Sequence, residues 1–150
     1  SFYKKQIFAQ VSPTKTTTRN QLELLEKSTE ATISNQLLNE HLTLFKRRIT
    51  AAVGRIDKIA TRISSRMEKM KVDGLITKKH NTSYTNIISQ IQILKTEWEK
   101  AETLSAKITN TNLEASYQPF RKQVLVVLGR FEIVLEAENT LVEDLIKLKK

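Results

Sequence analysis

The chain has 150 residues and a formal net charge of +9, with three Gly, two Pro and no Cys. Few helix breakers beside abundant Lys, Glu, Leu and Ile are typical of an all-α protein, and the lack of Cys excludes disulfides and thiolate chemistry. The longest apolar run, residues 124–128, is far shorter than the roughly 18 residues of a membrane-spanning helix. Because the sequence starts at Ser1 rather than Met, we expect that an upstream signal peptide, membrane anchor or expression tag was removed.

The first segment, residues 1–19, pairs a short apolar cluster with a Thr-rich stretch that contains Pro13. Proline and β-branched threonines disfavour a helix, so we interpret this segment as an anchor or docking piece followed by an extended linker. Residues 20–150 are then predicted to form a single helical-bundle domain, because a chain of this size suits one domain.

The next segment, residues 20–73, has a possible helix cap at Asn20 with Glu23 three residues later. Its periodicity is imperfect over residues 28–36, which predicts either a break between two helices or an exposed length of one. From Leu37 the pattern is strong, and it stops at Gly74, where glycine can end a helix in the left-handed conformation. Large apolar residues recur every seven positions in this stretch: Leu42, Ile49, Ile56, Ile63 and Met70.

Two more amphipathic stretches follow. One is predicted to start at Thr82 or Ser83 and to run to about Thr109, with Trp98 as the central core aromatic. The last is predicted to begin near Pro119, since proline suits a first helical turn, and to run to about residue 148. Long helices joined by short turns predict an all-α, elongated antiparallel three-helix bundle with an extended N-terminal segment, or four helices if the chain breaks between residues 28 and 36.

Most of the positive charge lies in residues 41–80, which carry eleven Lys and Arg against three Asp and Glu. Such a face raises the local concentration of anionic partners. The simplest alternative is that its side chains lie over the edge of the core and pair with Glu of a neighbouring helix. Nucleic-acid binding is a third reading, although no aromatic residue interrupts the basic run. The candidate residues for an anionic partner are Arg47, Arg48, Arg55, Lys58, Arg62, Arg66 and Lys69.

The sequence contains no recognisable catalytic or metal-binding motif. It has no glycine-rich phosphate loop, and His41 and His80, which we interpret as surface or turn residues, have no ligand companions at helical spacing. We therefore expect no enzymatic activity, metal or cofactor. Glu138 is the one charged residue on the apolar stripe of the last helix. It is either a rim residue where the bundle splays or a buried carboxylate paired with Arg55 or Arg62, and we favour the rim because burying a charge is costly.

The run from Arg48 to Leu75, followed by a polar turn and two amphipathic helices, resembles a group of uncharacterised helical proteins from reduced-genome bacteria. The resemblance covers about residues 40–150. Proteins of that group are typically predicted to be exported or membrane-anchored, with a similar Arg-Ile-x-x-Arg-hydrophobic-x-Lys-hydrophobic segment that closes on a Gly-hydrophobic turn. The resemblance implies an extracytoplasmic location and no particular activity, and the Thr-rich linker also resembles the spacer between an export signal and an envelope domain.

We therefore expect a non-enzymatic binding or scaffold module of the cell envelope that presents a basic helical face to a protein or an anionic surface. One alternative is a cytoplasmic nucleic-acid-associated protein. Another is a periplasmic chaperone-like cradle whose open surface would be lined by Glu138 and the wide apolar stripe of the last helix. A homo-oligomer stays open, because apolar seams of this kind also assemble between chains.

Overall fold

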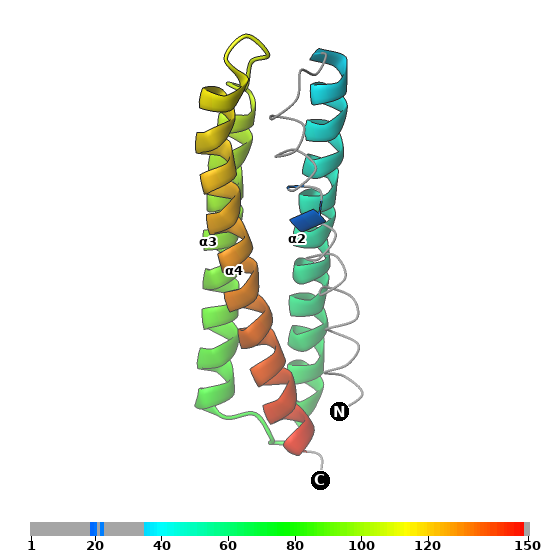
Figure 1. The fold of residues 1–150 in the computed structure, drawn as a ribbon. Helices are drawn as coiled ribbons and strands as arrows, with labels where there is room; N and C mark the ends of the chain where they lie inside the picture. The colour runs from blue at the N-terminus through cyan, green and yellow to red at the C-terminus, as the bar shows by residue number, and fades with distance from the viewer. Residues whose placement is uncertain (1–18, 21, 23–34, 149–150) are drawn as a thin grey trace.

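The structure is a computed structural model that describes residues 19, 20, 22 and 35–148. Three helices account for most of the described chain: α2 (Asn35–Val72), α3 (Lys78–Ser105) and α4 (Leu113–Lys147). They run alternately down, up and down the long axis of the molecule (Figure 1). The predicted all-α antiparallel three-helix bundle is therefore confirmed. Of the predicted N-terminal segment, only Arg19 is described, and it is helical; the rest of that segment and most of the 28–36 stretch lie outside the described residues.

The apolar seam of α2 faces the core as its spacing predicts. Leu42, Ile49, Ile56, Ile63 and Met70 are all buried. At about 1.5 Å per residue the 38 residues of α2 extend for about 57 Å, so the seam forms one long wall of the bundle. The end of α2 also matches the prediction. Gly74 adopts a φ of 71°, and the N–H of Leu75 donates to the carbonyl of Met70 at 3.1 Å, as in a Schellman motif.

Aromatic side chains join the three helices near one end of the core. The ring of Phe45 on α2 lies 6.3 Å from the ring of Trp98 on α3 and 5.7 Å from the ring of Phe120 on α4. Tyr117 extends this cluster along α4, with its ring 6.1 Å from that of Phe120. Trp98 is therefore a core aromatic, as predicted.

The start of α3 was predicted wrongly. The helix begins at Lys78, four residues before Thr82, because Thr77 and His80 form a cap that the sequence pattern did not reveal. The backbone N–H of Thr77 donates to Nδ1 of His80 at 3.0 Å, so the imidazole takes the role that Glu or Gln usually has in a capping box. His80 is consequently buried at a helix start and is not a surface residue. The other end was also misplaced: α3 stops at Ser105 rather than near Thr109, and the Ser105 hydroxyl donates to the carbonyl of Glu102 at 2.6 Å.

The start of α4 was predicted too late as well. The helix begins at Leu113, so Pro119 lies inside it rather than in its first turn. Leu113 packs against the core and Tyr117 is buried, which extends the apolar stripe toward the N-terminus of the helix. Ser116 fixes the preceding turn, because its hydroxyl accepts the backbone N–H of Thr109 at 3.0 Å and donates to the carbonyl of Asn112 at 2.6 Å.

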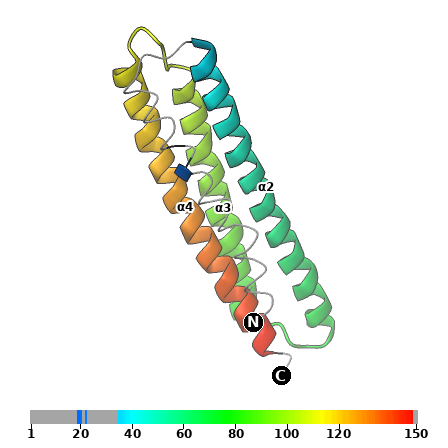
Figure 2. The same cartoon turned by 45° about the vertical axis from the view of Figure 1, so that its right-hand side comes forward.

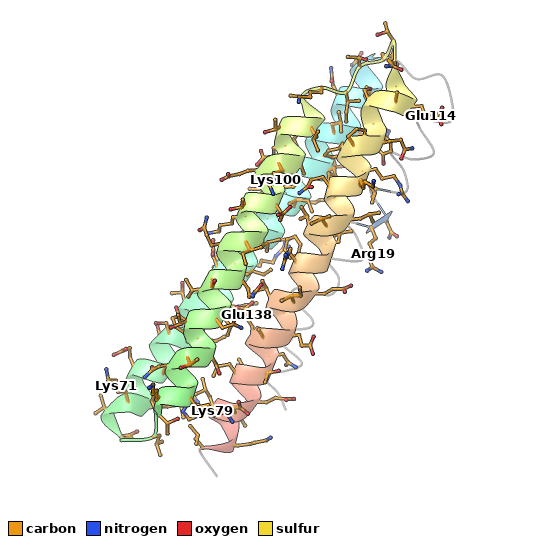
Figure 3. The ribbon with its side chains drawn as sticks, turned by 90° about the vertical axis from the view of Figure 1, so that its left-hand side faces the viewer. Arg19, Lys71, Lys79, Lys100, Glu114 and Glu138 are labelled. Atoms are coloured by element: carbon orange, nitrogen blue, oxygen red, sulfur yellow. The ribbon has the colours of Figure 1, made fainter. Side chains whose placement is uncertain are left out.

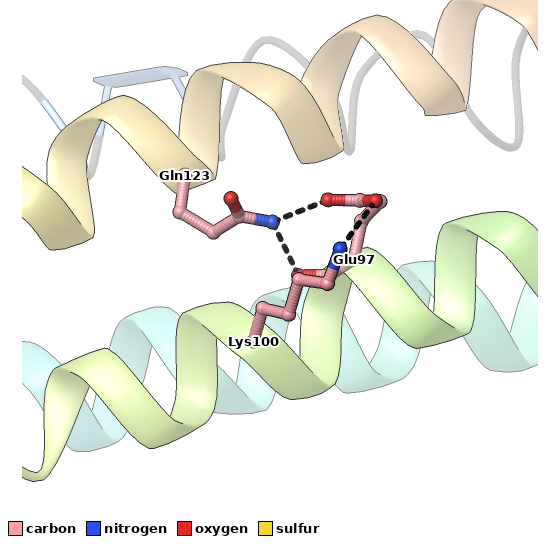
Figure 4. Close-up of polar contacts among 3 residues, drawn as sticks. All are labelled: Glu97, Lys100 and Gln123. Carbon is pink, nitrogen blue, oxygen red and sulfur yellow. Dashed lines mark hydrogen bonds and ion pairs between the residues drawn. The ribbon is translucent and has the colours of Figure 1, made fainter.

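The three helices are not equally close. α3 and α4 approach one another closely along their length, whereas α2 makes fewer close backbone approaches to either (Figure 2). Figure 4 shows hydrogen bonds that join α4 to α3. Nε2 of Gln123 on α4 donates to the backbone carbonyl of Glu97 at 2.8 Å and to its carboxylate at 2.7 Å. Lys100 lies 3.1 Å from the same carboxylate. The hydrogen bond from Gln123, aided by Lys100, holds the pKa of Glu97 below its usual range.

Candidate functional site: the basic face of α2

The seven candidate cations share one side of α2. Successive helical residues are about 100° apart, so Arg47, Arg48, Arg55, Lys58, Arg62, Arg66 and Lys69 fall within an arc of about 100°. Their side chains extend along more than half of the helix. Five of them are exposed, and Arg48 and Arg66 are half-buried. We call these seven residues the basic face.

The expected pairing of the basic face with neighbouring glutamates is largely missing. Within residues 19–20, 22 and 35–148, no ion pair or hydrogen bond engages the side-chain charges of Arg47, Lys58, Arg62 and Lys69. Arg55 does have a polar or electrostatic interaction, and so does Arg66. Four of the seven positive charges are therefore left facing solvent.

An ion pair joins α2 to α3, but it is the reverse of the expected one, in which a cation of α2 would pair with a Glu of a neighbouring helix. Asp57 supplies the acid from α2, and Lys95 supplies the base from α3, with 2.9 Å between Nζ and the carboxylate. Elsewhere Arg19, near the start of the chain, pairs with Glu132 on α4 at 3.0 Å, and Leu22 beside it is buried. Neither pair uses a residue of the basic face, so pairing across the bundle edge does not account for Arg47, Lys58, Arg62 and Lys69.

Exposed leucines continue the line of the basic face toward the start of α2. Leu37 is 40% exposed and Leu44 is 41% exposed, and both fall on the same arc as Arg62. Leu44 and Arg47 lie together in a shallow open depression whose other lining residues are Gln36, Asn39, Glu40 and Thr43. From the N-terminus of α2 onward, its outer side therefore presents apolar surface at Leu37 and Leu44 and then the positive charge of the basic face. The sequence did not indicate that these two leucines are exposed, although they are seven residues apart and therefore on one side of a helix.

Glu138 is the most unusual polar residue of the described core. Its side chain is 0% exposed, and neither carboxylate oxygen has a hydrogen-bond partner. Figure 3 labels it in the lower half of the bundle, where α4 faces α3. Burial, and secondarily the negative charge of Asp57, raises its pKa to about 8. A carboxyl group in such surroundings keeps its proton at neutral pH.

The expectation that Glu138 is a rim residue was wrong, because the residue is fully buried. The other reading, a carboxylate paired with Arg55 or Arg62, also fails, since neither oxygen of Glu138 accepts a hydrogen bond. The burial of Glu138 also removes it from the open surface that a chaperone-like cradle would have needed.

Among the described residues, no group of three His, Asp or Glu is arranged to hold a metal ion. No described helix is long and apolar enough to cross a membrane. No protein-family model, curated protein or solved structure matches the chain.

Proposed function

We propose that the protein is a non-enzymatic binding module of the cell envelope, and that the basic face of α2 is the surface that it presents to an anionic partner. The partner is either a layer of anionic lipid headgroups or an acidic protein surface. The observation that carries this proposal is that four exposed cations on one side of one helix are unpaired within the described chain. An extracytoplasmic location is part of the proposal, and it rests on the resemblance of residues 40–150 to helical proteins that are typically predicted to be exported or membrane-anchored.

Two physical effects would act together at this surface. The unpaired cations attract an anionic partner over a range of about 8 Å at physiological ionic strength, which raises the association rate. The exposed Leu37 and Leu44 then provide apolar area that is buried on contact. Because α2 packs into a bundle along its opposite side, the backbone of the face is already ordered and loses little conformational entropy on binding.

The experiment compares two variants that each lose three positive charges from a net charge of +9. The first replaces Lys58, Arg62 and Lys69 of the basic face with Gln, which keeps helix propensity high. The matched control replaces Lys78, Lys107 and Lys147, which are exposed outside α2. Binding to phosphatidylglycerol vesicles and to polyglutamate is measured at several salt concentrations.

The wild-type chain should bind at least one probe, and more weakly as salt rises. Each basic residue near an anionic surface contributes about 1 kcal/mol, so the basic-face variant should bind about 100-fold more weakly. The control should lose less than about threefold, because charges beyond the Debye length are screened. Equal losses in both variants, or binding to neither probe, would contradict the proposal. Tighter, salt-sensitive binding of duplex DNA would favour the nucleic-acid alternative instead.

A further inference from the structure

The side of α4 that faces away from the core carries a second regular row of residues. Five residues recur there at alternating intervals of four and three, which is the spacing of a seam between two helices. They are Lys122, Val126, Gly129, Ile133 and Glu136. Gly129 lies nine residues, or about two and a half helical turns, after the buried Phe120 and therefore on the opposite side of the helix. We call these five residues the outer seam.

The bundle itself does not require a glycine at position 129. A Cβ atom added to Gly129 would meet no other part of the described chain within 4 Å. Glycine is a poor helix former, and what it offers in a helix interior is room for the close approach of another backbone. Gly54 on α2 is equally open, but Arg47 and Lys58 of the basic face lie close to it along the helix, so two copies meeting there would bring like charges together.

The other residues of the outer seam are exposed. Val126 and Ile133 are two of the large apolar side chains that the fold leaves exposed. Lys122 and Glu136 are also exposed, and in the part of the chain that the structure describes no ion pair or hydrogen bond engages either side chain. The seam therefore offers apolar surface in its middle and one charge of opposite sign at each end.

The order of these residues is complementary to itself when the helix direction is reversed. If two copies of α4 lie antiparallel and cross at Gly129, each residue meets the one that is equally far on the other side of Gly129. Lys122 and Glu136 are seven residues before and after Gly129, so both ends of the contact would pair a lysine with a glutamate. Val126 precedes Gly129 by three residues and Ile133 follows it by four, so these apolar side chains would also meet across the contact.

We propose that the outer seam of α4 is a homodimer interface, in which two copies of the chain pack antiparallel and cross at Gly129. The basic face lies on α2 and the outer seam on α4, so the dimer stands or falls separately from the proposed function. A contact along about four helical turns is small for a specific interface, and we expect a dissociation constant on the order of 10 µM.

The experiment measures association of the whole chain by sedimentation equilibrium between about 1 and 300 µM, a range that brackets the expected dissociation constant. Two variants each reverse one charge of the outer seam, Lys122→Glu and Glu136→Lys. Their matched controls are Lys107→Glu and Glu99→Lys, which make the same charge changes at exposed positions outside α4. A fifth variant, Gly129→Gln, places a side chain at the crossing point.

The wild type and both controls should dimerise with similar affinity. Each seam charge variant should dimerise about tenfold more weakly, because two attractive contacts become two repulsive ones. An equimolar mixture of Lys122→Glu and Glu136→Lys should associate as tightly as the wild type, because each variant then supplies the charges that the other lacks. Gly129→Gln should keep its helical content by circular dichroism and dimerise at least about tenfold more weakly, because its side chain holds the two backbones apart.

Four outcomes would overturn the proposed dimer. Three concern association: a wild type that stays monomeric at the highest concentration, a mixture that associates no better than its two components, or controls that are weakened as much as the seam variants. The fourth is a loss of helical content in Gly129→Gln, which would show that the glycine is needed within the bundle itself.

Discussion

Replacement of Glu138 by Leu should raise the free energy of unfolding by about 3 kcal/mol at pH 7. The wild-type carboxyl has a pKa of about 8 in the folded state and its usual value near 4.5 when unfolded. Keeping it protonated at pH 7 therefore costs about 1.4 kcal/mol for each of about 2.5 pH units. Leucine removes this cost and also removes two oxygens that have no hydrogen-bond partner.

The pH dependence of this gain identifies its cause. Because the folded pKa is raised, the destabilising contribution of Glu138 is absent below pH 4.5 and grows until the pH passes about 8. We expect the advantage of Glu138→Leu in urea unfolding to be smallest at pH 4.5, where only the gain from removing the two oxygens remains, and to grow between pH 5 and 8. The exposed Glu136→Leu serves as the control and should show no such trend. An advantage of Glu138→Leu that stays constant over this range would show that Glu138 is not held protonated in the core.

Replacement of Phe45 by Ala should lower the free energy of unfolding by about 3 to 5 kcal/mol. Phe45 is 0% exposed, and its ring contacts Trp98 on α3 and Phe120 on α4. It therefore connects α2 to both other helices. Its truncation leaves a cavity among the three helices that the neighbouring aromatic rings cannot fill. A domain of this size has about 5 to 15 kcal/mol of stability in total, so the loss is a large fraction.

Urea unfolding followed by circular dichroism measures this loss, with Leu44→Ala as the matched control. Leu44 precedes Phe45 in the same helix but is 41% exposed, so its truncation should cost less than about 1 kcal/mol. Similar losses for the two variants would mean that Phe45 does not lie between the helices as described.

The sequence predicted the features that depend on repetition. The seam from Leu42 to Met70 is buried throughout, and Gly74 ends α2 in the left-handed conformation. Both predictions succeeded because they depend on local rules, helical periodicity and the conformational freedom of glycine. Trp98 was placed correctly for the same reason.

The predicted helix starts were wrong where a single side chain has an unusual structural role. His80 caps α3 in a role more common for Glu, so a turn was expected where the helix already begins. Pro119 was taken as a start signal, but burial of Tyr117 extends α4 beyond it.

The errors at the candidate site have a similar origin. Glu138 was placed at the rim because burying a carboxylate is costly, and the protein meets part of that cost by keeping the group protonated. The exposure of Leu44 depends on which side of α2 faces the other helices, which only the packed bundle defines. The seven cations were recognisable as one face from spacing, whereas the lack of partners at Arg47, Lys58, Arg62 and Lys69 could be found only from the positions of α3 and α4.

The most direct test of the basic face as the working surface is to map binding residue by residue. An isotopically labelled chain would be titrated with polyglutamate or with bicelles containing phosphatidylglycerol, while its backbone amide resonances are followed. We expect the largest shifts in residues 44–69 of α2, and we expect added salt to reverse them. Shifts centred on α3 or α4, or spread evenly over the bundle, would contradict this expectation.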